Sequence, residues 1–129
     1  SPDGSCMMVV LTDAPLDSRN LERLAKRAML GLSRTGGIAS NGSGDYVIAV
    51  STAEACRIPY ESDNPIQNIP SLRNEAMTSL FLATIEATEE AILNSLFAGE
   101  TIVGRDGHKI EALPNEKVIE MLREAGKID

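Results

Sequence analysis

The sequence predicts an α/β domain, and three observations favour this class. Two short apolar runs, residues 6–11 and 46–50, have the length and the β-branched content of buried strands. An amphipathic helical pattern lies between them, and a second, longer one follows. The length of 129 residues fits one domain with a real hydrophobic core. We therefore expect a single domain over residues 1–129.

The first helix is expected over residues 17–34, directly after the turn residues that end the first strand. Leucines and alanines recur there at steps of three and four, while arginines and lysines occupy most of the other positions. Asp17 or Ser18 should cap the N-terminus, because a short polar side chain can accept a hydrogen bond from the first backbone amides. The helix should end before Gly36 and Gly37.

Two loops and a second helix make up the middle of the chain. Residues 36–44 are rich in Gly, Ser and Asn and lead into the second strand. Residues 52–70 hold three prolines and show no period, and so long a loop is expected to line a site or a subunit contact. The longest helix is expected over residues 71–98, with Ser71 as its N-cap.

The C-terminal part of the chain predicts a hairpin and a last helix. Asp106 and Gly107 lie between two short apolar runs, which is a strong hairpin signal. Pro114 stands where a final helix would begin, and Gly126 where it would end.

Charge and hydropathy exclude several classes of partner. With 12 Lys and Arg against 19 Asp and Glu, the formal net charge is −7, so the chain is not expected to bind nucleic acid or anionic lipid. Its longest apolar run is far shorter than the roughly 20 residues needed to span a bilayer, and no leader pattern opens the chain. We expect a soluble protein in the cytoplasm, with the periplasm as the alternative. Cys6 and Cys56 are expected to be free thiols.

Hydrolytic chemistry needs a nucleophile, a proton acceptor and donors for a developing oxyanion. The one histidine, His108, falls in the predicted hairpin and is expected to be a surface residue, so a Ser-His-Asp triad is not expected. The cysteines lack the spacing of a zinc site, and no metal or other cofactor is expected.

Two short stretches could carry such chemistry, although each, on its residues alone, is more typical of an ordinary turn or loop. The Gly4–Ser5 junction stands at the start of a buried strand, and glycine permits a strained backbone in which the following hydroxyl attacks the preceding carbonyl. In residues 41–45 small residues allow close approach and expose amide donors, while Ser43 and Asp45 could form a hydroxyl–carboxylate pair.

Several blocks of the sequence, in this order, resemble the smaller chain of the L-aminopeptidase/D-esterase family, which includes the β-peptidyl aminopeptidases. The blocks are residues 3–16 (DGSCMMVVLTDAPL), 21–28 (LERLAKRA), 31–36 (GLSRTG) and 41–52 (NGSGDYVIAVST). Residues 104–107 (GRDG) and 113–114 (LP) are also similar, so the resemblance covers nearly the whole chain.

The resemblance implies a self-processing serine aminopeptidase. Family members are made as one precursor that cuts itself at a Gly-Ser bond, here matched by Gly4 and Ser5, and the released serine becomes the nucleophile. A serine and an acidic residue two positions later assist it, and these match Ser43 and Asp45. Asn41, Gly42 and Gly44 are then candidates for the oxyanion and substrate loop. The expected reaction releases N-terminal residues from short peptides, amides or esters through an acyl-enzyme on Ser5, without metal.

The resemblance also implies a layered α-β-β-α sandwich similar to that of ornithine acetyltransferases. Both predicted strands have the composition of strands buried on both faces, yet the chain offers too few strands for two packed sheets. The remaining strands are expected from a larger chain, the N-terminal part of the same precursor. A higher oligomer of such two-chain units is also expected.

One departure from the family pattern leaves alternatives open. Four residues precede Ser5, whereas the family mechanism leaves the nucleophile at the terminus, so Ser1 is a rival nucleophile. An acyltransferase would use the same acyl-enzyme and pass the acyl group to an amine. An uncut, inactive subunit used only for assembly is the third interpretation.

Overall fold

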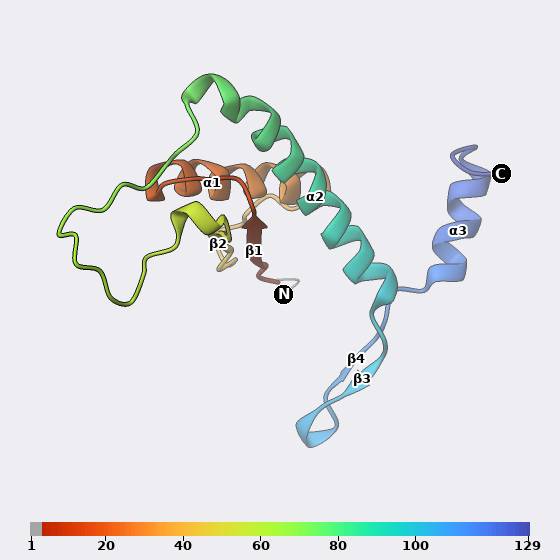
Figure 1. The fold of residues 1–129 in the computed structure, drawn as a ribbon. Coiled ribbons are helices and arrows are strands. Elements are labelled where there is room, and N and C mark those ends of the chain that lie inside the picture. Colours follow the sequence, from red (N-terminus) through yellow and green to blue (C-terminus); the bar gives the residue numbers. More distant parts are fainter. Residues whose placement is uncertain (1–3) are drawn as a thin grey trace. The chain divides into compact units, whose positions relative to one another are not determined.

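The computed structural model describes residues 4–129, and Ser1, the rival nucleophile, lies outside the described residues. The chain divides into two compact units, one up to Glu90 and one from Ala91 to Asp129. The elements follow the predicted order of strand, helix, strand, long helix, hairpin and final helix (Figure 1).

The first unit is built on a β-α-β arrangement. Strands β1 (Met7–Thr12) and β2 (Tyr46–Ser51) pair in parallel, and helix α1 (Ser18–Arg34) connects them and lies against the sheet. Asp17 caps α1 as predicted, because its side chain accepts a hydrogen bond from the backbone N–H of Asn20 at 2.8 Å.

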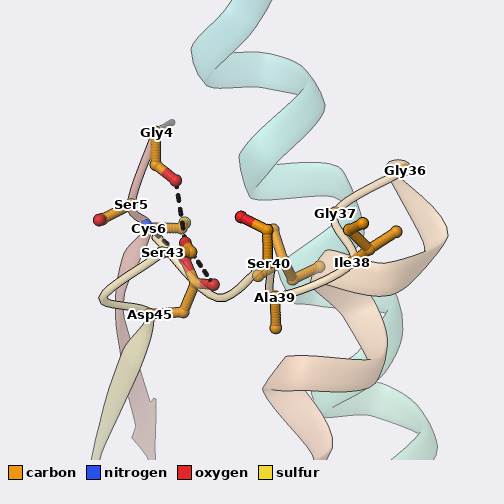
Figure 2. Close-up of a pocket in the computed structure, with 11 residues that line it drawn as sticks. Gly4, Ser5, Cys6, Gly36, Gly37, Ile38, Ala39, Ser40, Ser43 and Asp45 are labelled. Atoms are coloured by element: carbon orange, nitrogen blue, oxygen red, sulfur yellow. Dashed lines mark hydrogen bonds between the residues drawn. The ribbon is translucent and has the colours of Figure 1, made fainter. Parts of the chain in front are cut away.

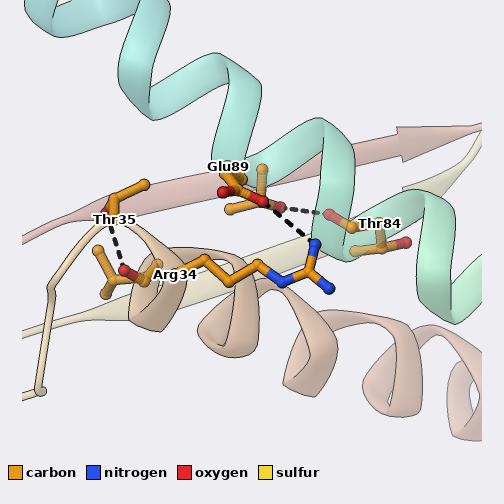
Figure 3. A network of polar contacts seen from close by, with 6 residues as sticks. Arg34, Thr35, Thr84 and Glu89 are labelled. Atoms are coloured by element: carbon orange, nitrogen blue, oxygen red, sulfur yellow. Dashed lines mark hydrogen bonds and ion pairs between the residues drawn. The ribbon is translucent and has the colours of Figure 1, made fainter. Parts of the chain in front are cut away.

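Helix α2 (Met77–Ala98) packs closely against α1. At Gly31 of α1, an added Cβ would lie 2.6 Å from the Cβ of Thr88 and 2.7 Å from the carbonyl oxygen of Ile85. The hydroxyl of Thr88 donates to the carbonyl of Thr84 at 2.7 Å, which satisfies a buried polar group inside the helix. Figure 3 shows the ion pair that joins the same two helices, between Arg34 and Glu89 at 3.1 Å.

The core of this unit consists of Leu16, Leu24 and Met77, each at most 2% exposed. It joins the end of the first strand region, the middle of α1 and the start of α2, so the two helices and one face of the sheet share one core. Partly buried apolar residues surround it: Val10, Ala14, Leu21, Leu72, Leu80 and Phe81.

One prediction about this unit is wrong. Ser71 does not cap α2, because a 3₁₀ turn, Asn74–Ala76, precedes the helix, which begins only at Met77. The Ser71 hydroxyl instead accepts hydrogen bonds from the backbone N–H of Asp17 and from the side chain of Asn20. This chain leaves one face of both strands uncovered, since every second side chain along each strand is exposed, as expected of a chain with too few strands for two packed sheets.

The second unit contains the end of α2, the predicted hairpin and the last helix. Strands β3 (Ile102–Val103) and β4 (Lys109–Ile110) pair antiparallel, which confirms the hairpin. Asp106 and Gly107 at its tip both have positive φ, as a type I′ turn requires. Helix α3 (Asn115–Glu124) begins after Pro114 as predicted, and none of its residues is buried.

Candidate active site

The parallel pairing of β1 with β2 brings the two predicted motifs together. Met7 lies opposite Tyr46, so the residues just before each strand, 4–6 and 43–45, are neighbours. The Ser5 side chain is exposed at this end of the sheet, and its Oγ accepts a hydrogen bond from the backbone N–H of Gly44 at 2.9 Å. Ser5 is thereby held beside the loop that carries the Ser43–Asp45 pair.

The carboxylate of Asp45 is fixed by two hydrogen bonds. Its Oδ1 accepts from the backbone N–H of Cys6 at 2.7 Å, and its Oδ2 accepts from the hydroxyl of Ser43 at 2.7 Å. The predicted hydroxyl–carboxylate pair is therefore formed. Because the Cys6 amide follows Ser5 in the chain, Asp45 also holds the backbone next to Ser5.

The hydroxyl of Ser43 has a second neighbour, the carbonyl oxygen of Gly4, at 2.9 Å. One hydroxyl proton is shared between these two acceptors, and a charged acceptor forms the stronger hydrogen bond. The Gly4 carbonyl belongs to the peptide bond that joins Gly4 to Ser5. Ser43 thus stands next to the one carbonyl that self-processing would attack.

Figure 2 shows how these side chains lie in a cavity of about 300 Å³. Ser43 and Asp45 face each other, while the hydroxyl of Ser5 points away from Ser43. Ser5 contacts the Gly44 amide and Ser43 contacts Asp45, so the predicted residues are neighbours without one continuous chain of hydrogen bonds.

The opposite wall of the cavity comes from residues 36–40, which the sequence analysis did not single out as part of a site (Figure 2). The sequence signals for it are the Gly36–Gly37 pair after the first helix and the Gly-, Ser- and Asn-rich composition of residues 36–44, and neither is specific to a site. The described residues that line the cavity are Gly4, Ser5, Cys6, Leu32, Gly36, Gly37, Ile38, Ala39, Ser40, Ser43 and Asp45.

The other candidate residues lie apart from the cavity lining or carry no contact that suggests chemistry. Asn41 and Gly42 are the exposed central residues of a turn that the Ser43 N–H closes on the Ser40 carbonyl at 2.9 Å, and neither lines the cavity. His108 is exposed and stands at the end of the hairpin tip.

The described part of the chain has few other chemical groups of note. Cys6 and Cys56 are both free thiols, as predicted. Within residues 4–129, no three His, Cys, Asp or Glu side chains gather as a metal site would require. None of the helices described in this range combines the length and the apolar character needed to cross a bilayer.

Similarity to known proteins extends over most of the chain. The model of Peptidase family S58 matches residues 1–110. Over 121 residues the chain is 42% identical to the β-peptidyl aminopeptidase BapA of Sphingosinicella microcystinivorans, covering 94% of this chain and 30% of that protein. The chain therefore spans about 30% of the length of the curated relatives that it matches.

The fold is likewise shared with solved structures. A protein of Pyrococcus horikoshii OT3 matches with a TM-score of 0.81 and 45% identity, over 93% of this chain and 34% of that one. The L-aminopeptidase D-Ala-esterase/amidase of Ochrobactrum anthropi, described as a prototype for the serine aminopeptidases and a new variant among the Ntn hydrolase fold, matches with a TM-score of 0.79 and 31% identity, over 94% of this chain and 34% of that one. With a family model that matches most of its length and with these structural neighbours, the chain belongs to peptidase family S58.

Proposed function

We propose that this chain is the nucleophile-bearing part of a serine aminopeptidase that releases N-terminal residues from short peptides, amides or esters. The observation that carries the proposal is the cavity in which Ser5 neighbours the hydrogen-bonded pair of Ser43 and Asp45. Membership in peptidase family S58 and the 42% sequence identity to a β-peptidyl aminopeptidase support the same activity.

In the proposed reaction, Ser5 first turns about χ1 from Gly44 toward Ser43, a rotation that exposed side chains make within nanoseconds. Its Oγ then attacks the scissile carbonyl carbon, its proton passes to Ser43 Oγ, and the Ser43 proton moves to Asp45 Oδ2. The turn of Ser5 also frees the Gly44 N–H, which donates to the carbonyl oxygen as that oxygen becomes negative.

The intermediate collapses when the C–N bond breaks. The proton held by Asp45 returns through Ser43 to the leaving amine, and the acyl group remains esterified to Ser5. Water then attacks the ester by the same route, which releases the acid and restores the Ser5 hydroxyl. Both half-reactions use the same proton acceptors, Ser43 and Asp45, and water is the only reactant besides the substrate.

The same residues support self-processing at the Gly4–Ser5 bond. Ser5 Oγ would attack the Gly4 carbonyl carbon, the C–N bond would break, and the proton would end on the Ser5 amine, leaving a Gly4 ester that water hydrolyses. The Ser43 hydroxyl, 2.9 Å from the Gly4 carbonyl oxygen, supports this step because it can donate to the developing oxyanion.

We further propose that a larger chain from the same precursor completes the fold as a layered α-β-β-α sandwich, similar to that of ornithine acetyltransferases. Two observations support this partner: the chain spans about 30% of its relatives, and one face of the β1–β2 sheet carries exposed apolar side chains. Two-chain units of this kind would assemble into a higher oligomer.

Substitution of Ser5 by alanine tests the function. In the complete protein, Ser5→Ala should abolish both the cut at Gly4–Ser5 and the release of p-nitroaniline from aminoacyl p-nitroanilides, because the nucleophile is lost. Intact mass and initial rates measure the two effects, and Cys56→Ala, which does not line the cavity, serves as the control that should retain most activity. A correctly cut, active Ser5→Ala enzyme is incompatible with the proposal.

Substitutions at the hydroxyl–carboxylate pair test the proton route. Ser43→Ala and Asp45→Asn should each lower kcat by about 10²-fold or more, the scale of a lost proton acceptor or oxyanion donor. Ser33→Ala, at an exposed serine on α1, is the matched control and should leave kcat unchanged. Near-normal turnover in both site variants would show that residues 41–45 are an ordinary loop without a catalytic role.

A further inference from the structure

The wall formed by residues 36–40 has no part in the proposed proton transfer, yet it faces the nucleophile across the cavity. Figure 2 shows the segment on the side of the cavity opposite Gly4 and Ser5. The largest side chain in it is Ile38, which is 86% exposed. An apolar side chain that is held beside a nucleophile and left uncovered can contact a substrate.

The wall is held at both ends by backbone hydrogen bonds. At the start, the N–H of Gly37 donates to the carbonyl of Leu32 at 3.2 Å, and Gly37 lies so close to that leucine that an added Cβ would be 2.7 Å from its Cγ. At the end, the Ser40 carbonyl accepts from the N–H of Ser43 at 2.9 Å, which joins the wall to the catalytic pair. Ala39 has a φ of 47°, a conformation that an L-residue adopts where the surroundings impose it.

Gly4 indicates which part of a substrate the wall meets. In the Gly4–Ser5 bond, Gly4 is the residue whose carbonyl Ser5 attacks, so it occupies the position of the acyl residue in a substrate. A Cβ built on Gly4 has no atom within 4 Å, and Gly4 lines the same cavity as residues 36–40. A side chain on the acyl residue therefore meets no described atom at its Cβ, and it starts from the lining of the cavity that residues 36–40 also line.

The chemistry of the cavity limits what that side chain can be. Asp45 is the one charged residue among the described residues that line it, and both of its carboxylate oxygens already accept hydrogen bonds. The wall itself consists of glycine, alanine, isoleucine and serine residues. A charged side chain placed there would lose water without gaining a partner, whereas an apolar one would gain contact with Ile38.

We propose that residues 36–40 form the subsite for the side chain of the N-terminal residue that is released, that this subsite accepts uncharged side chains, and that Ile38 sets their size. The proposal rests on the proposed aminopeptidase function, because it assigns a substrate position relative to Ser5.

The test compares alanyl and leucyl p-nitroanilides, or their β-amino-acid homologues, in the complete protein. Ile38→Trp should lower kcat/KM for the leucyl substrate at least tenfold relative to the alanyl substrate, and Ile38→Ala should shift the ratio in the opposite direction. Ile110→Trp is the control, because Ile110 is 73% exposed and does not line this cavity, and it should leave the ratio unchanged. If Ile38→Trp abolishes hydrolysis of both substrates, the leucyl-to-alanyl ratio of kcat/KM is measured in Ile38→Ala and Ile38→Leu, and these two variants test the proposal.

Two further measurements separate this proposal from the proposed function. Cleavage at Gly4–Ser5 should proceed normally in the Ile38 variants, since glycine places no side chain in the subsite. A substrate with a glutamyl residue should be hydrolysed at least tenfold less efficiently than its glutaminyl counterpart, which is uncharged and nearly the same size. An unchanged leucyl-to-alanyl ratio in all Ile38 variants, or equal hydrolysis of glutamyl and glutaminyl substrates, would overturn the subsite while Ser5 kept its role.

Discussion

Both faces of the β1–β2 sheet carry apolar side chains, but one face is covered and the other is exposed. On the face toward α1, Met8 is 7% exposed and its neighbours are partly buried. On the other face, Leu11 is 68% exposed although it is equally apolar. The register pairs the exposed side chains across the strands into one continuous patch, consisting of Met7, Val9, Leu11, Tyr46, Ile48 and Val50.

The apolar pattern of a strand therefore predicts that both of its faces become buried. It does not predict whether the segment that buries a face belongs to the same chain. The chain provides helices for one face and nothing, within the described residues, for the other. An exposed apolar patch of this kind, next to two unpaired strand edges, is typical of an interface with another polypeptide. Substitutions on each face in turn test this difference.

The largest effect is expected on the uncovered face. Ile48→Lys should abolish association with the proposed larger chain, because burying an unpaired ammonium in an apolar interface costs several kcal/mol. Co-expression with a tagged upstream segment, followed by pull-down and size-exclusion chromatography, measures the loss. Leu30→Lys, at an exposed position on α1 away from the uncovered face, should leave the complex intact.

The same comparison predicts the behaviour of the chain expressed alone. Residues 1–129 should be insoluble or associate non-specifically, whereas co-expression should give a stable complex. A lone chain that stays monomeric and unfolds cooperatively would mean that the uncovered face needs no partner.

A smaller effect is expected on the covered side, where α1 and α2 meet. Gly31→Ala should lower the free energy of unfolding of the complete protein by about 1–3 kcal/mol, since the new methyl group would overlap Thr88 and the Ile85 carbonyl. Thermal unfolding of the variant measures this loss, and Ser33→Ala, on the exposed side of α1, is the control. A fully stable Gly31→Ala would show that the two helices can move apart freely.

The smallest effect is expected from the ion pair between the same helices. The side chains of Arg34 and Glu89 are 45% and 33% exposed, so water screens their attraction. Arg34→Met should change the free energy of unfolding by less than about 1 kcal/mol. Unfolding in urea at low and high salt measures this change, and a loss as large as that of Gly31→Ala would assign the helix contact to charge and not to packing.

Local sequence determined the elements of this chain and most of their ends. The cap at Asp17 and the turn at Asp106 and Gly107 depend on interactions within four residues, which is why their residue types predict them. The Ser71 cap was predicted on the same local grounds and is wrong, because the hydroxyl contacts Asn20, 51 residues earlier in the chain. A rule based on neighbouring residues takes no account of a competing hydrogen-bond partner so far away in the sequence.

The candidate residues Ser5, Ser43 and Asp45 were named from the sequence by resemblance, while their proximity was decided by the tertiary structure. Gly4 and Ser43 are 39 residues apart and become neighbours because β1 and β2 pair in parallel with Met7 opposite Tyr46. A shift of one residue in that register would turn alternate side chains to the other face. The cavity and its wall at residues 36–40 arise from the same pairing together with the end of α1, so no local pattern could have predicted them.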